Sequence, residues 1–516
     1  MLSEDNIPEG HSFTGRGVEL HVATEGLALT QGGVFGRDGF PQVADWEDVA
    51  AVKLRPFGKV ADVQVEFADG RSPWVVRGVR LEEAQWAEDL IRDRLDVARA
   101  RTAPTFGRRA SLQQLPRTVR EMLNDPEERV APLLDYLLLQ AAHNGASDVH
   151  FEPMKASVKV RYRLDGVLVD AVDLPSRLER RLVSRLKVIG NMAIYRRDRP
   201  QEGRCFMELK DRSIDLRISI LPTVHGEKAT VRLFDSNRAT LPLDQLGMTD
   251  AQRSEFVDLI EGPQGAILLT GPSGSGKTTT MYSALRHIHE KQGSHRDIAT
   301  VEDPVEYDLG VINQTQVDPQ AGLTFAAGLR TVLRQDPDVI MVGEIRDPET
   351  AQTAIQAGLT GHLLLSTIHA RSAAGVFARL MEMGLEPYLV ASSVTAAVAQ
   401  RLVRLNCQHC AAPARPSAAA LTRVGDPGDC VFMAGRGCDA CNGTGYAGRT
   451  GVFEVLRVDD RFRGLITGKL PAAELEAQAG QFGTRSLRDA ALDLVRAGAT
   501  TLDEIARVLG WEDNGR

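Results

Sequence analysis

The stretch Gly271-Pro-Ser-Gly-Ser-Gly-Lys-Thr278 decides the fold, because it meets the phosphate-binding pattern G-x-x-x-x-G-K-[ST] between a predicted strand and a predicted helix. The apolar run 266–270 before it is typical of a buried parallel strand, and residues 279–289 after it indicate a helix. A glycine-rich turn that matches by chance is the alternative, and the flanking pattern argues against it.

Each part of this stretch has a chemical task. The glycines let backbone N–H groups close around the β- and γ-phosphates, Lys277 supplies a point charge to the same oxygens, and the Thr278 hydroxyl can bind Mg²⁺. We therefore expect ATP and Mg²⁺ as ligands of a phosphate loop made of Gly271, Pro272, Ser273, Gly274, Ser275, Gly276, Lys277, Thr278 and Thr279.

Length and composition limit the class of protein. The 516 residues predict about three domains, and 43% hydrophobic with 25% charged residues is ordinary for a globular protein. A net charge of −8 argues against a protein that coats nucleic acid without sequence preference, so no nucleic-acid partner is expected. Because no apolar stretch approaches the ~20 residues that span a bilayer and the acidic N-terminus lacks signal-peptide character, we expect a cytoplasmic protein whose membrane association is peripheral.

The N-terminal part divides into two predicted domains and a linker. Residues 1–97 alternate with period two and end in a helical pattern, which predicts a β-rich module that weakly resembles a pleckstrin-homology-like barrel. This module is either a docking module or a stabilising appendage. Residues 98–125 are a basic linker by composition, either a solvated tether or a contact for anionic lipid or an acidic partner. Residues 126–236 begin with a helix and continue with strands, an α+β pattern.

Residues 237–516 alternate strands and helices, which predicts an α/β domain with a doubly wound, mainly parallel sheet around the phosphate loop. Ligands of such sheets lie outside the carboxyl ends of the strands. Glu302, Asp303, Glu344 and His369 end predicted strands and are candidates for the site, whereas Asp338 and His362 begin strands.

Phosphoryl transfer to water needs a carboxylate to position the water and a cation for the developing charge. We assign Glu344 to the water. Gly343 occupies the position where many such ATPases keep a metal-binding aspartate, so Mg²⁺ would rely on Thr278, phosphate oxygens and water, with either Glu344 or Glu302 acting through water. His369 is either a γ-phosphate sensor or a structural histidine. Arginines lie on both sides of the second strand, at Arg330, Arg334 and Arg346, and an arginine supplied in trans would require a ring of subunits.

Four cysteines form two C-x-x-C pairs, Cys407 with Cys410 and Cys438 with Cys441, within an insertion at 404–446. Each pair lets two thiolates reach one ion at about 2.3 Å, and four thiolates make a closed tetrahedral site without an open catalytic position. We therefore predict a structural Zn²⁺ site, the alternative being metal-free thiols; His409 could compete as a ligand.

Together these motifs resemble the ATPases of type II secretion and type IV pilus assembly, over roughly residues 126–510. The residues that resemble this family include segments of the second domain, the family's aspartate box, its variant of the second nucleotide-binding motif, its histidine box and its four metal-binding cysteines. These are 146–153, 161–166, 199–204, 215–219, 226–227, 300–306, 343–347, 360–369 and the two cysteine pairs.

The resemblance implies a RecA-like P-loop fold and a homo-hexameric ring at the cytoplasmic face of the inner membrane. It further implies an inner-membrane platform protein that the ring moves, and a membrane recruitment protein. Arg217 and Arg232 would approach the nucleotide from the second domain, whereas from the residues alone they read as surface salt bridges. The cysteine pairs favour an assembly or secretion member over a retraction member. Residues 1–97 differ from the all-helical first domain that is usual in the family.

Two other functions fit parts of the pattern. A nucleic-acid-translocating or DNA-uptake ring predicts hydrolysis stimulated by DNA, which the acidic balance disfavours. A nucleotide-gated scaffold with little turnover is motivated by Gly343 in the metal position.

Overall fold

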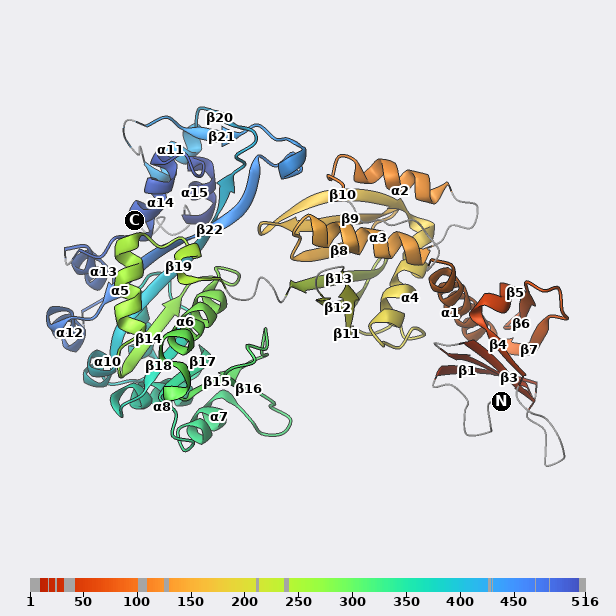
Figure 1. The fold of residues 1–516 in the computed structure, drawn as a ribbon, viewed down its shortest axis with the longest axis horizontal. Helices are drawn as coiled ribbons and strands as arrows, with labels where there is room; N and C mark the ends of the chain where they lie inside the picture. The colour runs from red at the N-terminus through yellow and green to blue at the C-terminus, as the bar shows by residue number, and fades with distance from the viewer. Residues whose placement is uncertain are drawn as a thin grey trace. The chain divides into compact units, whose positions relative to one another are not determined.

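The computed structural model describes residues 10–16, 18–23, 26–31, 42–100, 109–124, 130–209, 213–235, 241–425, 428, 430–468, 470–481 and 483–509. The chain forms two compact units, Met1–Asp235 and Ser236–Arg516 (Figure 1). The first unit contains both predicted N-terminal domains, and the second contains the phosphate loop.

The N-terminal module consists of two antiparallel sheets and one helix. The first sheet has β1 (Gly10–Gly15), β2 (Val18–Ala23), β3 (Gly26–Gln31) and β4 (Gln42–Asp45), and the second has β5 (Val49–Phe57), β6 (Val60–Phe67) and β7 (Trp74–Arg80). Alternate residues of β6 are buried, as the period-two pattern predicts. The helix α1 (Leu81–Ala100) buries Ala84, Ala87 and Ile91 against these strands, so the predicted β-rich module closed by a helix is confirmed.

Only part of the predicted basic linker is described, because 101–108 and 125 lie outside the described residues. Its first residues belong to α1, and α2 (Leu115–Leu123) lies near its end, with Leu115 and Val119 buried in the core of the second domain. Asn144 also donates to the carbonyl oxygen of Ala110 at 2.9 Å. Residues 109–124 therefore pack on the fold, unlike a solvated tether.

The second domain is an antiparallel sheet in the order β10-β9-β8-β13-β12-β11. Its strands are β8 (Asp148–Pro153), β9 (Ser157–Leu164), β10 (Val167–Pro175), β11 (Gln201–Glu208), β12 (Ser213–Thr223) and β13 (Gly226–Asp235). One face is apolar and shares a core with α3 (Val130–His143) and α4 (Glu179–Ile189), while the other face carries charged side chains. Within this unit α1 contacts α3 and α4, and Asp89 lies 3.3 Å from the Arg180 guanidinium.

The second unit has a seven-stranded sheet in the order β16-β15-β17-β18-β14-β19-β22. Its strands are β14 (Gly265–Thr270), β15 (Ile298–Glu302), β16 (Asn313–Gln316), β17 (Val339–Ile345), β18 (Leu363–Ile368), β19 (Val394–Asn406) and β22 (Tyr446–Arg457). All neighbouring pairs are parallel except β19 with β22. Because β18 lies between β14 and β17, the chain order of the five central strands is that of a RecA-like P-loop domain, as predicted.

Helices cover both faces of this sheet. α5 (Asp250–Ile260) and α6 (Lys277–Gln292) share one core with it, and α7 (Phe325–Val332), α8 (Pro348–Leu359), α9 (Gly375–Glu382) and α10 (Pro387–Ser393) share the other. The central strands are buried on both sides, and every residue of β14 and of β18 is buried. The doubly wound arrangement predicted from the alternation is therefore confirmed.

The cysteine insertion connects the antiparallel strands β19 and β22, which pair from Ala396 with Arg457 to Asn406 with Tyr446. It contains β20 (Ala411–Pro413), α11 (Ala418–Val424) and β21 (Met433–Gly435). The chain ends with α12 (Asp460–Thr467), α13 (Ala472–Gln481), α14 (Leu487–Arg496) and α15 (Leu502–Leu509).

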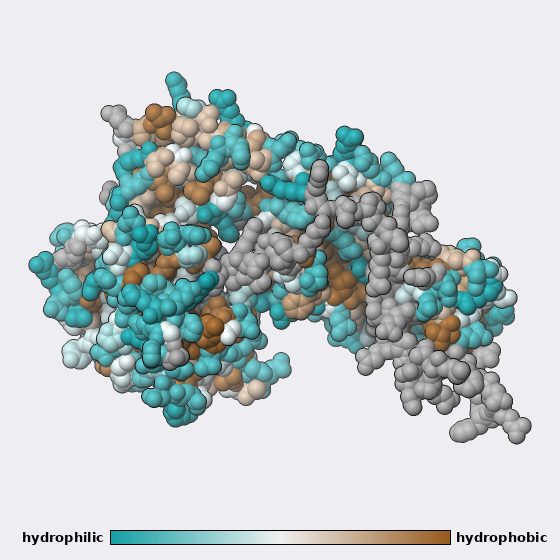
Figure 2. Space-filling view, in the orientation of Figure 1, coloured by the Kyte–Doolittle hydropathy of each residue, from teal (hydrophilic) through white to brown (hydrophobic). Residues whose placement is uncertain are grey.

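None of the helices among the described residues is long and apolar enough to cross a membrane. On the face seen in Figure 2, hydrophilic residues predominate and hydrophobic residues form small separate patches.

Candidate functional site

The phosphate loop connects β14 to α6, as the sequence predicts. Gly276 is the residue before the helix and has φ 89°, a left-handed conformation that favours glycine. A Cβ on Gly276 would lie 2.8 Å from the Gln400 amide nitrogen, and a Cβ on Gly271 would overlap the Gln400 carbonyl oxygen. The loop is therefore built against β19 and leaves no room for side chains at these two positions.

The polar groups of the loop fit the phosphates of a nucleotide. The Lys277 ammonium donates to the carbonyl oxygens of Gly271 at 2.8 Å and Pro272 at 3.0 Å, which holds it inside the loop. The Ser275 hydroxyl is buried without a hydrogen-bond partner among the described residues, and Thr278 lies half-buried in the first turn of α6. The N–H groups of that turn are free of intrahelical acceptors, as at every helix N-terminus, and attract anions. These residues would hold the phosphates of ATP, and the Thr278 hydroxyl would bind Mg²⁺.

Glu344 and His369 come together at the carboxyl ends of two adjacent strands. Glu344 lies near the end of β17 and His369 directly follows β18, and the His369 Nε2 is 3.8 Å from the Glu344 Oε2. The other oxygen of Glu344 pairs with Arg346. Since β18 is also the neighbour of β14, this pair lies at the same edge of the sheet as the phosphate loop.

Electrostatics also connect the loop to this pair. Burial lowers the pKa of Lys277, the positive charge of Arg401 lowers it further, and the carboxylate of Glu344 acts in the opposite direction. Arg401 and Glu344 are therefore both close enough to Lys277 to change its pKa. Of these two residues, the sequence analysis predicts only Glu344 as part of the site.

Glu302 occupies a different environment from Glu344. It ends β15, as predicted, but is only 3% exposed, and both of its oxygens accept hydrogen bonds from neighbouring side chains. The donors are the Tyr282 hydroxyl, the Thr300 hydroxyl at 2.6 Å and the Gln314 amide at 3.0 Å. Burial raises the pKa of Tyr282, and the bond to Glu302 adds to this shift.

Three polar residues near the loop were missed by sequence reasoning. Thr270 ends β14, and Gln400 and Arg401 lie side by side in β19; all three are at most 3% exposed. The Gln400 amide oxygen accepts from the Thr280 hydroxyl of α6 at 2.9 Å. The signal in the sequence is the polar pair 400–401 within the otherwise apolar stretch 396–403, because buried polar groups need partners.

The remaining candidate residues either lie away from Glu344 and His369 or form bonds with other residues. His362 precedes β18 at the opposite edge of the sheet, where its Nδ1 is 3.1 Å from the Ala357 carbonyl oxygen. Asp338 precedes β17 and accepts from the backbone N–H of Asp297 at 2.8 Å. Arg330 pairs with Glu349.

Arg217 and Arg232 belong to the first unit, on the charged face of its sheet. They are directly opposite each other on β12 and β13, and the register continues through Arg204 on one side and Asp148 and Arg163 on the other. Arg232 donates to Asp148 at 3.0 Å, and the Arg217 Nε lies 3.8 Å from Asp215. The surface salt bridges expected from the residues alone are therefore present, in a row of arginines across the sheet.

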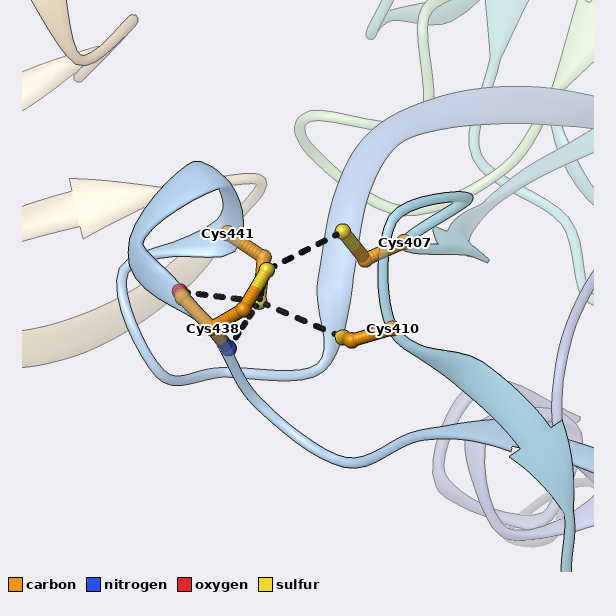
Figure 3. A group of neighbouring side chains, drawn as sticks. All are labelled: Cys407, Cys410, Cys438 and Cys441. Carbon is orange, nitrogen blue, oxygen red and sulfur yellow. Dashed lines mark hydrogen bonds between the residues drawn. The ribbon is translucent and has the colours of Figure 1, made fainter.

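The four cysteines converge on one point (Figure 3). Their Sγ atoms lie within 4.8 Å of one another, with Cys407 to Cys438 and Cys410 to Cys441 both at 3.8 Å. A tetrahedron with Zn–S bonds of about 2.3 Å has edges of about 3.8 Å, so the sulfurs are spaced for one Zn²⁺.

The backbone around the cysteines also fits a thiolate cluster. The N–H groups of Cys438 and Gly445 point at the Cys441 sulfur, at 3.1 and 3.3 Å. Burial favours the neutral thiol of Cys441, but these N–H groups and the neighbouring thiols of Cys438 and Cys410 together outweigh it and lower the pKa to about 7. Gly435 and Gly445 approach so closely that a Cβ on either would overlap the backbone of the other.

Comparison with known proteins agrees with this geometry. The family described as "Type II/IV secretion system protein" matches residues 124–507. The type II secretion system ATPase E of Vibrio cholerae is 43% identical over 398 residues, which are 77% of this chain and 78% of that protein. The type II secretion system protein HxcR of Pseudomonas aeruginosa is 41% identical over 479 residues, 90% of this chain and 98% of that protein. A match to 90% of this chain extends into residues 1–97.

Among solved structures, the Yersinia pseudotuberculosis ATPase DotB has a TM-score of 0.55 at 19% identity, over 73% of this chain and 92% of that one. That likeness is one of fold. The match over 124–507 and the identities above 40% show that the chain belongs to the type II secretion and type IV pilus assembly ATPase family and is an ATP-hydrolysing enzyme.

Proposed function

We propose that the chain is the subunit of a homo-hexameric motor that uses ATP hydrolysis to power type II secretion or the assembly of a type IV pilus or pseudopilus. The observation that carries the chemical part is the meeting of Glu344 and His369 beside the phosphate loop. The relatives named for type II secretion support the biological part, since one of them matches 90% of this chain.

In this proposal each residue at the carboxyl-end edge of the sheet, beside the phosphate loop, has one task. Glu344 positions the attacking water, His369 responds to the γ-phosphate, and Lys277 neutralises charge on the phosphate oxygens. Bound Mg²⁺ supplies further charge neutralisation, with Thr278 as its ligand from the protein. Glu302 is proposed to act on Mg²⁺ only through water, and its buried network makes it less accessible than Glu344. Zn²⁺ on the four cysteines has a structural role.

The ring follows from the need for an arginine at the γ-phosphate. Arg346 and Arg330 of the second unit are paired with Glu344 and Glu349. We propose that Arg217 and Arg232 of the first unit, which pair with Asp215 and Asp148 of their own sheet, supply a further cation to the nucleotide in the ring. Their row contains four arginines and only two carboxylates, Asp215 and Asp148, so the row itself carries net positive charge.

We further propose that the ring works at the cytoplasmic face of the inner membrane, as a peripheral protein. An inner-membrane platform protein would receive the motion, and a membrane recruitment protein would hold the ring in place. The N-terminal module, residues 1–97, is proposed as the docking module.

Replacing Lys277 by Ala tests the coupling of hydrolysis to export. The variant should fold, lose ATP hydrolysis and lose export in a strain that lacks the native copy, because the loop loses its charge on the phosphates. Preserved export with a folded Lys277→Ala chain would overturn the motor.

A second experiment tests the ring. ATP hydrolysis per subunit should rise with protein concentration as subunits assemble, with Glu344→Gln as the inactive control. Turnover per subunit that stays constant from dilute monomer to assembled protein would mean that each subunit is self-sufficient. Stimulation by DNA in the same assay would instead favour a nucleic-acid-translocating ring.

A further inference from the structure

The segment after His369, residues 370–373, is held by side chains from three different strands. The Thr270 hydroxyl of β14 donates to the Ala370 carbonyl oxygen at 2.8 Å and accepts from the Ala370 N–H at 2.9 Å. The Arg401 guanidinium of β19 donates to the Arg371 carbonyl oxygen at 3.0 Å. Glu454 of β22 accepts from the Ala373 N–H at 3.2 Å. The backbone that follows His369 is therefore fixed at three of its residues, Ala370, Arg371 and Ala373.

Arg401 also lies against the phosphate loop. Its Nη1 donates to the Gln400 carbonyl oxygen at 2.9 Å and lies 3.1 Å from the point where a Cβ on Gly271 would be. The side chain is buried, and its charge reaches Lys277. One guanidinium thus lies between the first glycine of the phosphate loop and the segment that follows His369.

Glu454 completes this arrangement from the neighbouring strand. It is opposite Ala399 in the β19–β22 pairing, so it lies on the same face of the sheet as Arg401, two residues along. Burial raises the pKa of Glu454, and the charge of Arg401 acts in the opposite direction. Its second oxygen lies 3.4 Å from the backbone nitrogen of Leu487, the first residue of α14, which therefore contacts the same network.

We propose that Arg401 is a positioning residue for ATP hydrolysis, which holds the backbone that follows His369 in register with the phosphate loop. Hydrogen bonds from a charged donor are stronger than neutral ones, and the planar fork of arginine can serve two carbonyl groups at once. A shift of a catalytic group by about 1 Å can cost on the order of 10²-fold in rate. The effect of Arg401 should therefore fall on the rate of hydrolysis, with little effect on nucleotide binding.

The test compares four full-length variants with the wild type at matched assembly, by kcat, KM for ATP and thermal unfolding. Arg401→Gln should lower kcat at least about tenfold while KM changes less than about threefold, the pattern of a lost transition-state interaction. Arg401→Lys should recover part of kcat, because it restores a charged donor but not the fork. Unchanged kcat in Arg401→Gln, or a loss that appears wholly in KM, would overturn the proposal.

Arg404→Gln is the matched control, since Arg404 is a second arginine of β19 that pairs with Glu504, away from the phosphate loop. It should lower the unfolding temperature and leave kcat per folded subunit unchanged; an equal loss of kcat would overturn the specific role of Arg401. If Arg401→Gln does not fold, Thr270→Val removes the adjacent bonds to Ala370 with little change of shape and should show the same loss of kcat.

The inference rests on the proposed role of His369, and one more variant separates the two proposals. A fully active His369→Ala chain would overturn the role of His369, whereas unchanged kcat in both Arg401→Gln and Thr270→Val would overturn the positioning of the segment.

Discussion

At the scale of single residues, one constraint outside the site is a charge cluster around the buried carboxylate of Glu504. This carboxylate is 1% exposed and accepts from the guanidinium groups of Arg404 and Arg507, both at 2.6 Å. It also accepts from the backbone N–H of Arg404 at 3.1 Å. The cluster fastens α15 to β19, the strand that carries Gln400 and Arg401.

We predict that Glu504→Ala destabilises the second unit by about 3 kcal/mol at pH 7, because it leaves the Arg404 side chain, which is only 15% exposed, without its partner. Burial alone would raise the pKa of Glu504, but the two arginines outweigh it and lower the pKa below its ordinary value. A lowered pKa contributes stability above the unfolded-state pKa of about 4.3 and loses it as the pH falls further. Denaturant unfolding should therefore show a smaller difference between wild type and Glu504→Ala at pH 3 than at pH 7.

The two acids of the site should respond differently to amide substitution. Glu344→Gln should lower kcat by about 10²- to 10⁴-fold and keep nucleotide binding, since it removes the group assigned to the water. Glu302→Gln should have a smaller effect on kcat and a larger one on the unfolding temperature, because it disturbs the acceptor of Tyr282, Thr300 and Gln314. Equal kcat values for wild type and Glu344→Gln would contradict the assignment.

At the scale of elements, the cysteine insertion is a small unit with little apolar core of its own. Its two short strands, β20 and β21, pair over only three residues each, and Cys407 and Cys441 are its most buried cysteines. Structural Zn²⁺ sites of this kind contribute folding free energy directly. Most of the long pairing of β19 with β22, from Ala396 with Arg457 to Val403 with Thr450, lies outside the insertion and should not depend on the metal.

We predict one Zn²⁺ per chain, lost on Cys438→Ser. Loss of the metal should unfold the insertion while the central sheet stays folded, which hydrogen exchange would show as lost protection confined to residues 407–445. Cys205→Ser is the control, because Cys205 lies in β11 of the first unit. An unchanged zinc content after Cys438→Ser would contradict the four-cysteine site.

At the scale of the whole molecule, the catalytic edge and the arginine row belong to different compact units. An arginine that reaches the γ-phosphate is worth about 10³- to 10⁵-fold in kcat where it acts as a finger. Arg217→Gln and Arg232→Gln should therefore each lower kcat strongly and leave the fold of the sheet intact. Lys159→Gln, which removes an exposed cation that pairs with Asp170 on the same sheet, should have little effect. Similar activity in all three variants would contradict delivery of an arginine by the first unit.

Local patterns in the sequence determined a large part of this protein. Short stretches of residues of the right type and spacing were enough to predict the phosphate loop, the two cysteine pairs and the strand ends at Glu344 and His369. Each of these features depends on the conformation of a few neighbouring residues or on two nearby side chains that bind the same ion. The same patterns predicted the β-rich module and the doubly wound sheet, since side-chain periodicity reports which face of an element is buried.

Only the tertiary structure decided how distant segments meet. The order of the strands places β18 between β14 and β17, and this brings His369 to Glu344. It also encloses Glu302 in its network and brings Arg401 between the phosphate loop and the segment after His369. Apart from the bond between Thr300 and Glu302, these contacts join residues 12 or more positions apart in the chain. The free energy of packing both faces of the sheet selects them, whereas no local pattern specifies a neighbour in a sheet.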